Sequence, residues 1–503
     1  MTKTHCPQSP DPKRLLTEFR TLRAKITAEC KALWNAWESE DMRPEFRPSA
    51  QNLAHYLALR HADLTPLQPD LAGLGLSTLG RTEPHVRASL DAVEATLATL
   101  AEGGPWDRLP RPGCEDFAQG PARLAARRDR LFGAGASGAP RSRILLTLPT
   151  EAATDPDLIP EMIRAGADSM RINCAHDGPE VWAAMIARIR AAESEIGRSV
   201  PVLMDLAGPK LRTGPVFGPK KPRVFVGDRL DILRETPSGK VKHISTTLSH
   251  PELIDHLTVG MPVFIDDGKI GTEVVKLTKK GARLRVTRAG PKGVKVKPEK
   301  GFNLPSVEID IPALTEADRT ALDFVVGHAD MIGYSFVQTP EDIRLLIKEV
   351  DQRLAKGAAR PGLVLKIETA LAVRNLPRLI VQAGALSETA VMIARGDLAV
   401  EIGMERMSEI QEELLWLCEA AHTPVVWATQ VLEGLMKEGL ATRAETTDAA
   451  MAQRADCVML NKGPYVLDTI HFLSRILGRM DRHMSKKSAR LAPLRSWKGN
   501  LSL

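Results

Sequence analysis

Cysteine is scarce in this sequence, which has only six among its 503 residues, and no two of them stand in C-x-x-C spacing. Such a low density excludes a disulfide framework. Long apolar runs are also missing, and the first thirty residues carry Pro7, Pro10 and Pro12 where a signal peptide would have a continuous apolar segment. We therefore expect neither a signal peptide nor a membrane span, and we expect the protein in the cytoplasm.

Aromatic residues and excess charge are scarce as well. The chain has 7 Trp, 3 Tyr and 11 Phe, and its 68 Lys and Arg against 62 Asp and Glu give a net charge of only +6. Few aromatic rings leave few platforms for stacked bases, so no nucleic-acid partner is expected. The content of 43% hydrophobic and 26% charged residues is typical of a globular protein, and this length predicts about three domains.

The first 105 residues predict an N-terminal α-helical region. Apolar residues recur at steps of three and four from Leu15 to Trp37 and from Val86 to Leu100, and a shorter helical stretch lies around Asn52 to Arg60. We expect these helices to pack against one another or against a neighbour rather than to form a coiled coil. Residues 106–140 are rich in Gly and Pro and predict a linker. Its basic cluster is expected on a solvated face: Arg123, Arg127, Arg128 and Arg130.

From residue 141 onward, short runs with β-branched or Met residues alternate with helical periods, which is the pattern of an α/β parallel sheet. Eight such runs predict a closed (β/α)8 TIM barrel. The runs are Ile144–Leu148, Ser169–Asn173, Val202–Leu206, Met331–Phe336, Leu363–Glu368, Ala390–Ala394, Val425–Thr429 and Cys457–Asn461.

More than a hundred residues separate the third run from the fourth, and the intervening segment alternates like β-strands. We therefore predict an all-β domain inserted after strand 3. The predicted division is a barrel of residues 141–214 and 299–485, an inserted domain of residues 215–298 and a basic tail of residues 486–503. One more helix, about Val466 to Met480, should follow the last strand, and no further C-terminal domain is expected.

Polar residues stand at the ends of most of these runs. In such a barrel the functional face lies at the carboxyl ends of the strands, and residues two apart on a strand share a face. Lys366 and Glu368 should therefore point the same way, as should Arg171 and Asn173. The other polar strand-end residues are Asp205, Ser335, Arg395, Gly396, Asp397, Thr429 and Gln430.

These residue types suit two kinds of ligand. Carboxylates without a Cys or His partner favour a hard divalent cation such as Mg²⁺. A Lys and an Arg beside them would bind an anion, and Gly396 would let the backbone approach that anion closely. The alternative is a ring of salt bridges around a barrel mouth, but so many polar strand ends favour a site.

Several local strings also resemble the pyruvate kinase family in order and spacing. The resemblance covers about residues 141–480, and eight ordered motifs are far more specific than a single glycine loop. The motifs are Met170–Asn173, Asp205–Gly214, Ile265–Gly268, Lys300–Pro305, Lys366–Glu368, Ala394–Leu398, Ala428–Gln430 and Thr442–Glu445.

The resemblance implies a Mg²⁺-dependent (or Mn²⁺-dependent) phosphotransferase that converts phosphoenolpyruvate and ADP to pyruvate and ATP. By this resemblance Glu368 and Asp397 hold the metal ion, and Lys366 lies against the transferring phosphoryl group. Arg171 and Arg212 contact phosphates.

Other roles also follow from the resemblance alone. Thr429 helps to deliver a proton to the enolate carbon, and Gly396 belongs to the substrate-binding set. Asn173, His176 and Lys300 belong to the nucleotide-binding set. The inserted β domain corresponds to the mobile lid domain of the family, with Asp266, Asp267 and Lys300 near its hinge or inner face.

Two loops depart from the family pattern. The usual Thr-x-Gly-Pro after the first strand is Thr147-Leu148-Pro149 here, and the usual Ser-Gly-Glu-Thr-Ala after the eighth strand is replaced by Asn461–Tyr465. Both loops lie on the nucleotide side of the family's site, so the identity of the nucleoside diphosphate that accepts the phosphoryl group stays open.

Two rival functions also stay open at this point. One is a catalytically degenerate pyruvate kinase-like protein kept for binding or regulation, and the other is a metal-dependent pyruvate-enolate lyase. Ordinary members lack the N-terminal helices and carry a C-terminal regulatory domain. Because we expect no such C-terminal domain here, we also expect no effector site of the kind that it carries. For the same reason we expect a dimer rather than a tetramer.

The last expectation concerns K⁺. Family members that require K⁺ hold it partly through a Ser, the Asp of the Asp-x-x-Gly-Pro motif and a Glu after that Pro. Here Ala175 stands at the Ser position, Asp205 is kept, and Lys210 stands at the Glu position, as in members that dispense with K⁺. A fixed ammonium would supply the positive charge, so we expect no K⁺ requirement.

Overall fold

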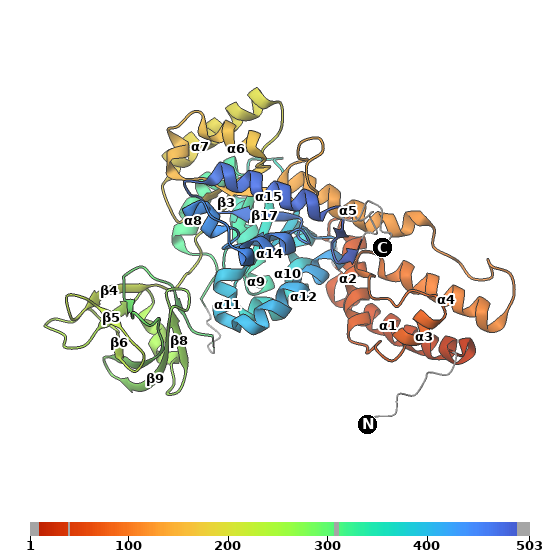
Figure 1. The fold of residues 1–503 in the computed structure, drawn as a ribbon, viewed down its shortest axis with the longest axis horizontal. Helices are drawn as coiled ribbons and strands as arrows, with labels where there is room; N and C mark the ends of the chain where they lie inside the picture. The colour runs from red at the N-terminus through yellow and green to blue at the C-terminus, as the bar shows by residue number, and fades with distance from the viewer. Residues whose placement is uncertain (1–9, 39–40, 306–310, 490–503) are drawn as a thin grey trace, which may run out of the picture.

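The computed structural model describes residues 10–38, 41–305 and 311–489 of the chain (Figure 1). The red and orange N-terminal helices lie on one side of a central barrel, and the green β domain lies on the other. Within these ranges no helix is both long enough and apolar enough to cross a membrane.

Eight parallel strands form the closed barrel that the sequence predicts, in the order β1-β17-β16-β15-β14-β13-β3-β2. Each observed strand begins and ends within two residues of its predicted run. The strands are β1 Arg143–Thr147, β2 Ser169–Asn173, β3 Val202–Asp205, β13 Met331–Tyr334, β14 Gly362–Ile367, β15 Thr389–Ala394, β16 Val425–Ala428 and β17 Cys457–Leu460.

Helices on the outside of the barrel connect these strands. Four of them begin after a capping threonine. Its hydroxyl accepts a hydrogen bond from the backbone amide three residues later, which satisfies one of the free N–H groups of the first turn. These threonines are Thr315, Thr339, Thr369 and Thr442. The helices are η2 Thr150–Ala153, α6 Leu158–Ala165, α7 Pro179–Ile196, α8 Glu316–His328, α9 Pro340–Arg353, α10 Ala370–Leu386, α11 Arg395–Ile402, α12 Met404–Ala420, α13 Glu433–Glu438, α14 Arg443–Ala452 and α15 Val466–Met480.

The inserted β domain leaves the barrel after β3, as predicted, and returns before α8. Its main sheet has the order β12-β8-β9-β10-β6-β7-β4, and β11 pairs with β5. The domain has its own apolar core, which includes Leu230, Val263 and Leu284. Its elements are β4 Thr213–Phe217, β5 Arg223–Val224, β6 Arg229–Leu233, β7 Ser245–Leu248, η3 Pro251–His256, β8 Pro262–Ile265, β9 Ile270–Thr278, β10 Gly281–Arg288, β11 Val294–Lys295 and β12 Phe302–Asn303.

The N-terminal helices pack together, as expected from their apolar stripes. Helix α1 (Pro12–Trp37) lies along both α2 (Arg47–Arg60) and α4 (Val86–Glu102). It buries Leu15, Phe19 and Ile26 on the shared side. The short helices α3 (Gln68–Gly73) and η1 (Glu83–His85) complete this region.

The predicted linker is wrong for about half of its length, because residues Cys114–Phe132 form helix α5. Gly120 and Pro121 are among the Gly and Pro residues that predict a linker here. Gly120 instead allows close packing of α5 on η1, since a Cβ at this position would lie 1.9 Å from the carbonyl oxygen of Pro84. This helix position therefore needs a glycine because a neighbouring segment packs directly against it.

The predicted solvated arginine face is also partly wrong. Arg127 and Arg128 are only 6% and 8% exposed. Arg127 has no carboxylate partner among the described residues and donates instead to Ser49 Oγ at 2.9 Å and to the carbonyl oxygens of His422 and Glu45, each at 2.9 Å. This helix face is therefore an internal contact between the N-terminal helices and the barrel.

The end of α5 closes the base of the barrel, by which we mean the amino-terminal end of its strands. Phe132 is fully buried, and Leu131 is nearly so. Both belong to the core inside the barrel, together with strand residues such as Leu145, Leu203 and Val426. The barrel interior is thus a packed core whose lower end is filled by the N-terminal region.

The C-terminal hairpin of β18 (Met484–Ser485) and β19 (Ser488–Ala489) lies at the start of the predicted basic tail. Lys486 within it is buried, and its Nζ lies 2.6 Å from Asp456 Oδ2. The rest of the predicted tail, residues 490–503, lies outside the described residues.

Candidate active site

The alternation of side chains along the barrel strands decides which residues reach the mouth, the carboxyl end of the barrel. Leu363, Leu365 and Ile367 of β14 pack outward against the helices, whereas Val364 belongs to the interior core. Lys366 and Glu368 have the same parity as Val364, so they extend the interior face toward the mouth. The same parity holds for Arg171 on β2 and Asp205 on β3, because their neighbours pack outward.

Four polar side chains meet at this mouth. Asp205 accepts from Arg171 Nε and Nη2 at 2.8 and 2.5 Å, and its other oxygen lies 3.3 Å from Lys366 Nζ. Lys366 donates to Ser335 Oγ at 2.6 Å. Gly333 makes room for this cluster, since a Cβ there would lie 2.5 Å from Asp205 Oδ1. The ammonium is therefore held in one position.

The same neighbours decide the protonation of these groups. Burial alone would raise the pKa of Asp205, but the charges of Lys366 and Arg171 outweigh it and hold this pKa below its usual range. Burial alone would lower the pKa of Lys366, but Asp205 and Glu368 outweigh it and raise this pKa. Lys366 is thus a fixed cation at neutral pH.

Glu368 lies beside this cluster and is 3% exposed. One of its oxygens accepts from the amide of Phe336 at 2.6 Å, and the other lies 3.4 Å from Lys366 Nζ. Burial raises the pKa of Glu368, and the negative charge of Asp397 raises it further. A cation between Glu368 and Asp397 would relieve this repulsion.

Asp397 stands in the first turn of α11, where Lys210 reaches it from the loop after β3. Lys210 Nζ donates to Asp397 Oδ2 at 3.0 Å and lies 2.8 Å from Oδ1, and Oδ1 accepts no hydrogen bond from the described residues. The described part of the chain has no cluster of three or more His, Cys, Asp or Glu side chains suited to a metal. Two carboxylates fit Mg²⁺, which keeps most of its positions for water and substrate oxygens.

Thr429 is held by two neighbours at the end of β16. Its Oγ1 accepts from the amide of Gly396 at 2.8 Å, and its carbonyl oxygen accepts from Arg395 Nη2 at 2.8 Å. Arg395 also donates to Asp448 Oδ2 at 2.8 Å and lies over the Trp427 ring. The φ angle of Thr429 is +66°, a left-handed conformation that costs energy for a β-branched residue, so this clamp holds a strained backbone.

The side chains of several predicted site residues make no hydrogen bond or ion pair with the Lys366 cluster in the described residues. Asn173 ends β2 beside Asp205 of β3, and its side chain accepts from the amide of Ala175 at 3.2 Å. His176 is exposed in the loop that follows. Arg212 donates to the carbonyl oxygen of Glu299 at 3.1 Å, at the root of the lid domain.

The lid residues Lys300 and Asp266 pair with each other, and the three expected K⁺-site residues do not pair with one another in the described residues. Lys300 Nζ lies 3.3 Å from Asp266 Oδ1, and Asp267 stands beside Asp266 with a positive φ. In the described residues Ala175, Asp205 and Lys210 make no hydrogen bond or ion pair with one another, since Asp205 pairs with Arg171 and Lys366 while Lys210 pairs with Asp397.

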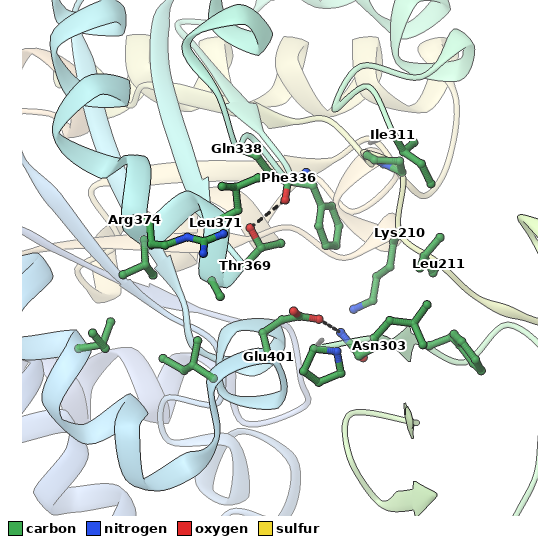
Figure 2. Close-up of a pocket in the computed structure, with 18 of the residues that line it drawn as sticks. Lys210, Leu211, Asn303, Ile311, Phe336, Gln338, Thr369, Leu371, Arg374 and Glu401 are labelled. Atoms are coloured by element: carbon green, nitrogen blue, oxygen red, sulfur yellow. Dashed lines mark hydrogen bonds between the residues drawn. The ribbon is translucent and has the colours of Figure 1, made fainter. Parts of the chain in front are cut away.

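A cleft of about 370 Å³ adjoins Lys210 between the lid domain and the barrel (Figure 2). Asn303 of β12 donates to Glu401 of α11 across it at 3.4 Å. Burial raises the pKa of Glu401 to about 7. Figure 2 also shows the hydrogen bond between Thr369 and Gln338, at 3.2 Å, on the barrel side of this cleft.

The sequence interpretation missed three of these residues. Glu401 could have been found, because it follows Asp397 by four residues and so shares its face of α11. Asn303 lies within the Lys300–Pro305 motif, but the resemblance assigns it no role. Asp448 carries no local signal, because only the packing of α14 brings it to Arg395.

A closed (β/α)8 barrel with an inserted β domain and paired charges at its mouth defines the structural class of this protein. The family model described as pyruvate kinase, barrel domain, matches residues 139–467. The chain therefore belongs to the pyruvate kinase family.

Curated relatives agree with this assignment. The chain is 33% identical to a pyruvate kinase of Agrobacterium vitis over 353 residues, which cover 68% of this chain and 70% of that protein. It is 34% identical to a pyruvate kinase of Methylorubrum extorquens over 350 residues, 68% of this chain and 69% of that protein. A pyruvate kinase of Mycobacterium tuberculosis is 32% identical over 344 residues, 67% of this chain and 69% of that protein.

Proposed function

We propose that this protein transfers the phosphoryl group of phosphoenolpyruvate to ADP in the cytoplasm, with pyruvate and ATP as products. The observation that carries the proposal is the ammonium of Lys366, held at 2.6 Å by Ser335 and flanked by Asp205 and Glu368 at 3.3 and 3.4 Å. Phosphoryl transfer needs little covalent chemistry from a protein and depends on charge placed correctly in advance. A cation already held in position meets that need.

The proposed roles follow from the charges and contacts at the mouth. Lys366 and Arg171 stabilise negative charge on the phosphoryl group and on the enolate oxygen. Glu368 and Asp397 would hold Mg²⁺ or Mn²⁺, which would supply positive charge to neutralise phosphate oxygens. Asn173, beside Asp205 at the mouth, and His176 in the loop after β2 would contact nucleotide phosphates. Arg212 and Lys300 would reach phosphates if the lid domain approaches the mouth.

We propose that Thr429 passes a proton to the enolate carbon. Because the amide of Gly396 donates to Thr429 Oγ1, the hydroxyl keeps its own hydrogen for donation. Arg395 supports this role through the Thr429 carbonyl oxygen.

We also propose that turnover does not require K⁺. The support is the ammonium of Lys210, which lies 2.8 Å from a carboxylate oxygen of the proposed metal ligand Asp397. A K⁺ ion about 4 Å from that ammonium would meet a repulsion of about 4 kcal/mol at an effective dielectric of about 20.

A coupled assay with phosphoenolpyruvate, Mg²⁺ and a panel of nucleoside diphosphates tests the function. We expect pyruvate and nucleoside triphosphate in equal amounts. Pyruvate formed from phosphoenolpyruvate without any diphosphate would instead be hydrolysis, with release of inorganic phosphate. No turnover with any diphosphate, together with pyruvate released by carbon–carbon cleavage of a larger 2-oxo or 2-hydroxy acid, would support a lyase. No turnover in either assay would support a degenerate binding protein. The acceptor is an open question because Pro149 and Asn461–Tyr465 replace family residues on the nucleotide side. The panel of diphosphates also identifies it.

A further inference from the structure

A second cavity, of about 430 Å³, lies between the N-terminal helices and the barrel base. We call it the junction cavity. Its walls come from α2, α4, α5, the Pro110–Pro112 segment and the loop before β16. None of its residues belongs to the proposed active site, which lies at the opposite end of the barrel.

The wall of the cavity carries several arginine and histidine side chains. Arg87, Arg123, His55 and His85 all line the cavity. Among the described residues Arg123 has a single hydrogen-bond partner, Gln119 Oε1 at 3.2 Å, and no carboxylate partner. A guanidinium in this state can bind both oxygens of a phosphate or carboxylate.

The two carboxylates in the wall are already engaged. Asp91 forms an ion pair with Arg23 of α1 and lies 3.7 Å from Arg87 Nε. Asp116 accepts from the amide of Gly113 at 2.8 Å and so caps α5. Neither carboxylate forms an ion pair with Arg123 among the described residues, and three arginines against two carboxylates leave the wall with an excess of positive charge.

The cavity also touches the strand that leads to Thr429. His422 lines it, and its Nε2 lies 2.9 Å from the carbonyl oxygen of Pro84 while its Nδ1 lies 3.0 Å from Ser49 Oγ. Strand β16 begins three residues later, at Val425, and Thr429 follows its last residue. A short, fully buried strand thus joins the cavity wall to the mouth.

We propose that the junction cavity binds a small molecule carrying a phosphate or carboxylate group, held by Arg87 and Arg123, and that its binding changes turnover at the mouth. The effect on turnover rests on the proposed function, whereas the binding does not. Because the site is built mainly by the N-terminal helices, it is a candidate regulatory site that the barrel alone would lack.

An NMR titration that follows the imidazole signals of the cavity histidines tests binding directly in the full-length protein. Burial lowers the pKa of both His55 and His85, and an anion beside them would raise it, so their NMR signals report occupancy. The probes are inorganic phosphate and citrate, which separate phosphate from carboxylate recognition. His55→Gln and His85→Gln assign the two signals.

Variants of the two arginines locate the binding. Arg87→Gln with Arg123→Gln should weaken the binding of the better probe by about tenfold or more, because charge-assisted hydrogen bonds are lost. Arg378→Gln, which changes an exposed arginine of α10 outside the cavity, should leave it unchanged. The same probe should change kcat/KM in the wild type and in Arg378→Gln but not in the double variant.

Three results would overturn the proposal. The first is that neither probe shifts the His55 and His85 signals saturably. The second is that the shifts persist at full strength in the double variant. The third is that bound probe leaves kcat/KM unchanged, which refutes the regulatory step. Failure of the proposed function would instead appear as no turnover without any probe, while the NMR titration would still report binding.

Discussion

Two buried cations, Lys366 at the mouth of the barrel and Arg127 at its base, have opposite surroundings. At the mouth, charges face charges: Lys366 lies between Asp205 and Glu368, and Lys210 lies on Asp397. At the base, Arg127 donates to neutral oxygens and has no carboxylate partner in the described part of the chain, and burial lowers its pKa to about 10. Carboxylates at the mouth can exchange a lysine for a metal ion, whereas carbonyl oxygens at the base offer no such exchange. The mouth is therefore suited to chemistry and the base to holding two regions together.

This comparison predicts that mouth variants change turnover and that base variants change stability. The largest effect should come from Lys366→Met, which should lower kcat by about 10³-fold or more, because the ammonium acts on charge that exists mainly in the transition state. KM should change far less. Steady-state kinetics with phosphoenolpyruvate measures both constants. Lys348→Met, on the outer surface of α9, is the matched control, and unchanged kcat in Lys366→Met would refute the site assignment.

At the base, Phe132→Ala should lower the free energy of unfolding by about 3–5 kcal/mol, because it removes a fully buried ring from the barrel core. Denaturant unfolding measures the loss. The folded fraction should keep kcat within about twofold, since the ring lies far from the reacting groups. A loss of kcat comparable to that of Lys366→Met would break the division between the two ends.

The burial of His422 predicts how the stability of the folded protein changes at low pH. Burial lowers its pKa from 6.5 to about 4 in the folded protein. Between these pH values the unfolded chain binds a proton that the folded protein does not, so stability is lost as the pH falls from 6.5 to about 4, by up to about 3 kcal/mol. The free energy of unfolding, plotted against pH across this range, should change less for His422→Gln than for the wild type. Parallel curves for the two proteins would contradict the prediction.

Glu368→Gln should weaken metal binding at the mouth by about tenfold or more, because one of two carboxylate ligands becomes neutral. The binding of Mn²⁺, followed by electron paramagnetic resonance, measures this without turnover. Glu405→Gln, an exposed position at the start of α12, should bind Mn²⁺ like the wild type. Equal affinity in both variants would place the metal elsewhere.

The smallest effect is expected for K⁺. Replacing K⁺ by tetramethylammonium at constant ionic strength should leave wild-type turnover nearly unchanged, because Lys210 supplies a fixed charge. Lys210→Glu with Ala175→Ser should move the enzyme toward K⁺ dependence. An increase of about tenfold or more when K⁺ is added to the wild type would contradict the role of Lys210.

Sequence patterns were sufficient for the barrel because its signals are local. Each strand is a short apolar run, and the parity along a strand decides which side chains face inward. The parity from Val364 to Lys366 and Glu368 therefore predicted that both polar side chains face the same way. The ordered motifs added the family and the candidate roles.

The α5 segment was misjudged because its reason for being helical is not local. Gly120 and Pro121 resemble breakers in sequence, but Gly120 is the position where η1 and His422 approach the helix. The burial of Arg127 likewise depends on carbonyl oxygens from residues far away in the chain.

The sequence by itself determined the eight strands, their order along the chain, the position of the insertion and the polar residues at the strand ends. Tertiary structure alone decided which charges meet. Lys210 and Asp397 are 187 residues apart, and Asn303 and Glu401 are 98 apart, so no periodicity could pair them. It also decided that the N-terminal region fills the barrel base, because Phe132 gains its burial from several strands that converge only when the barrel closes.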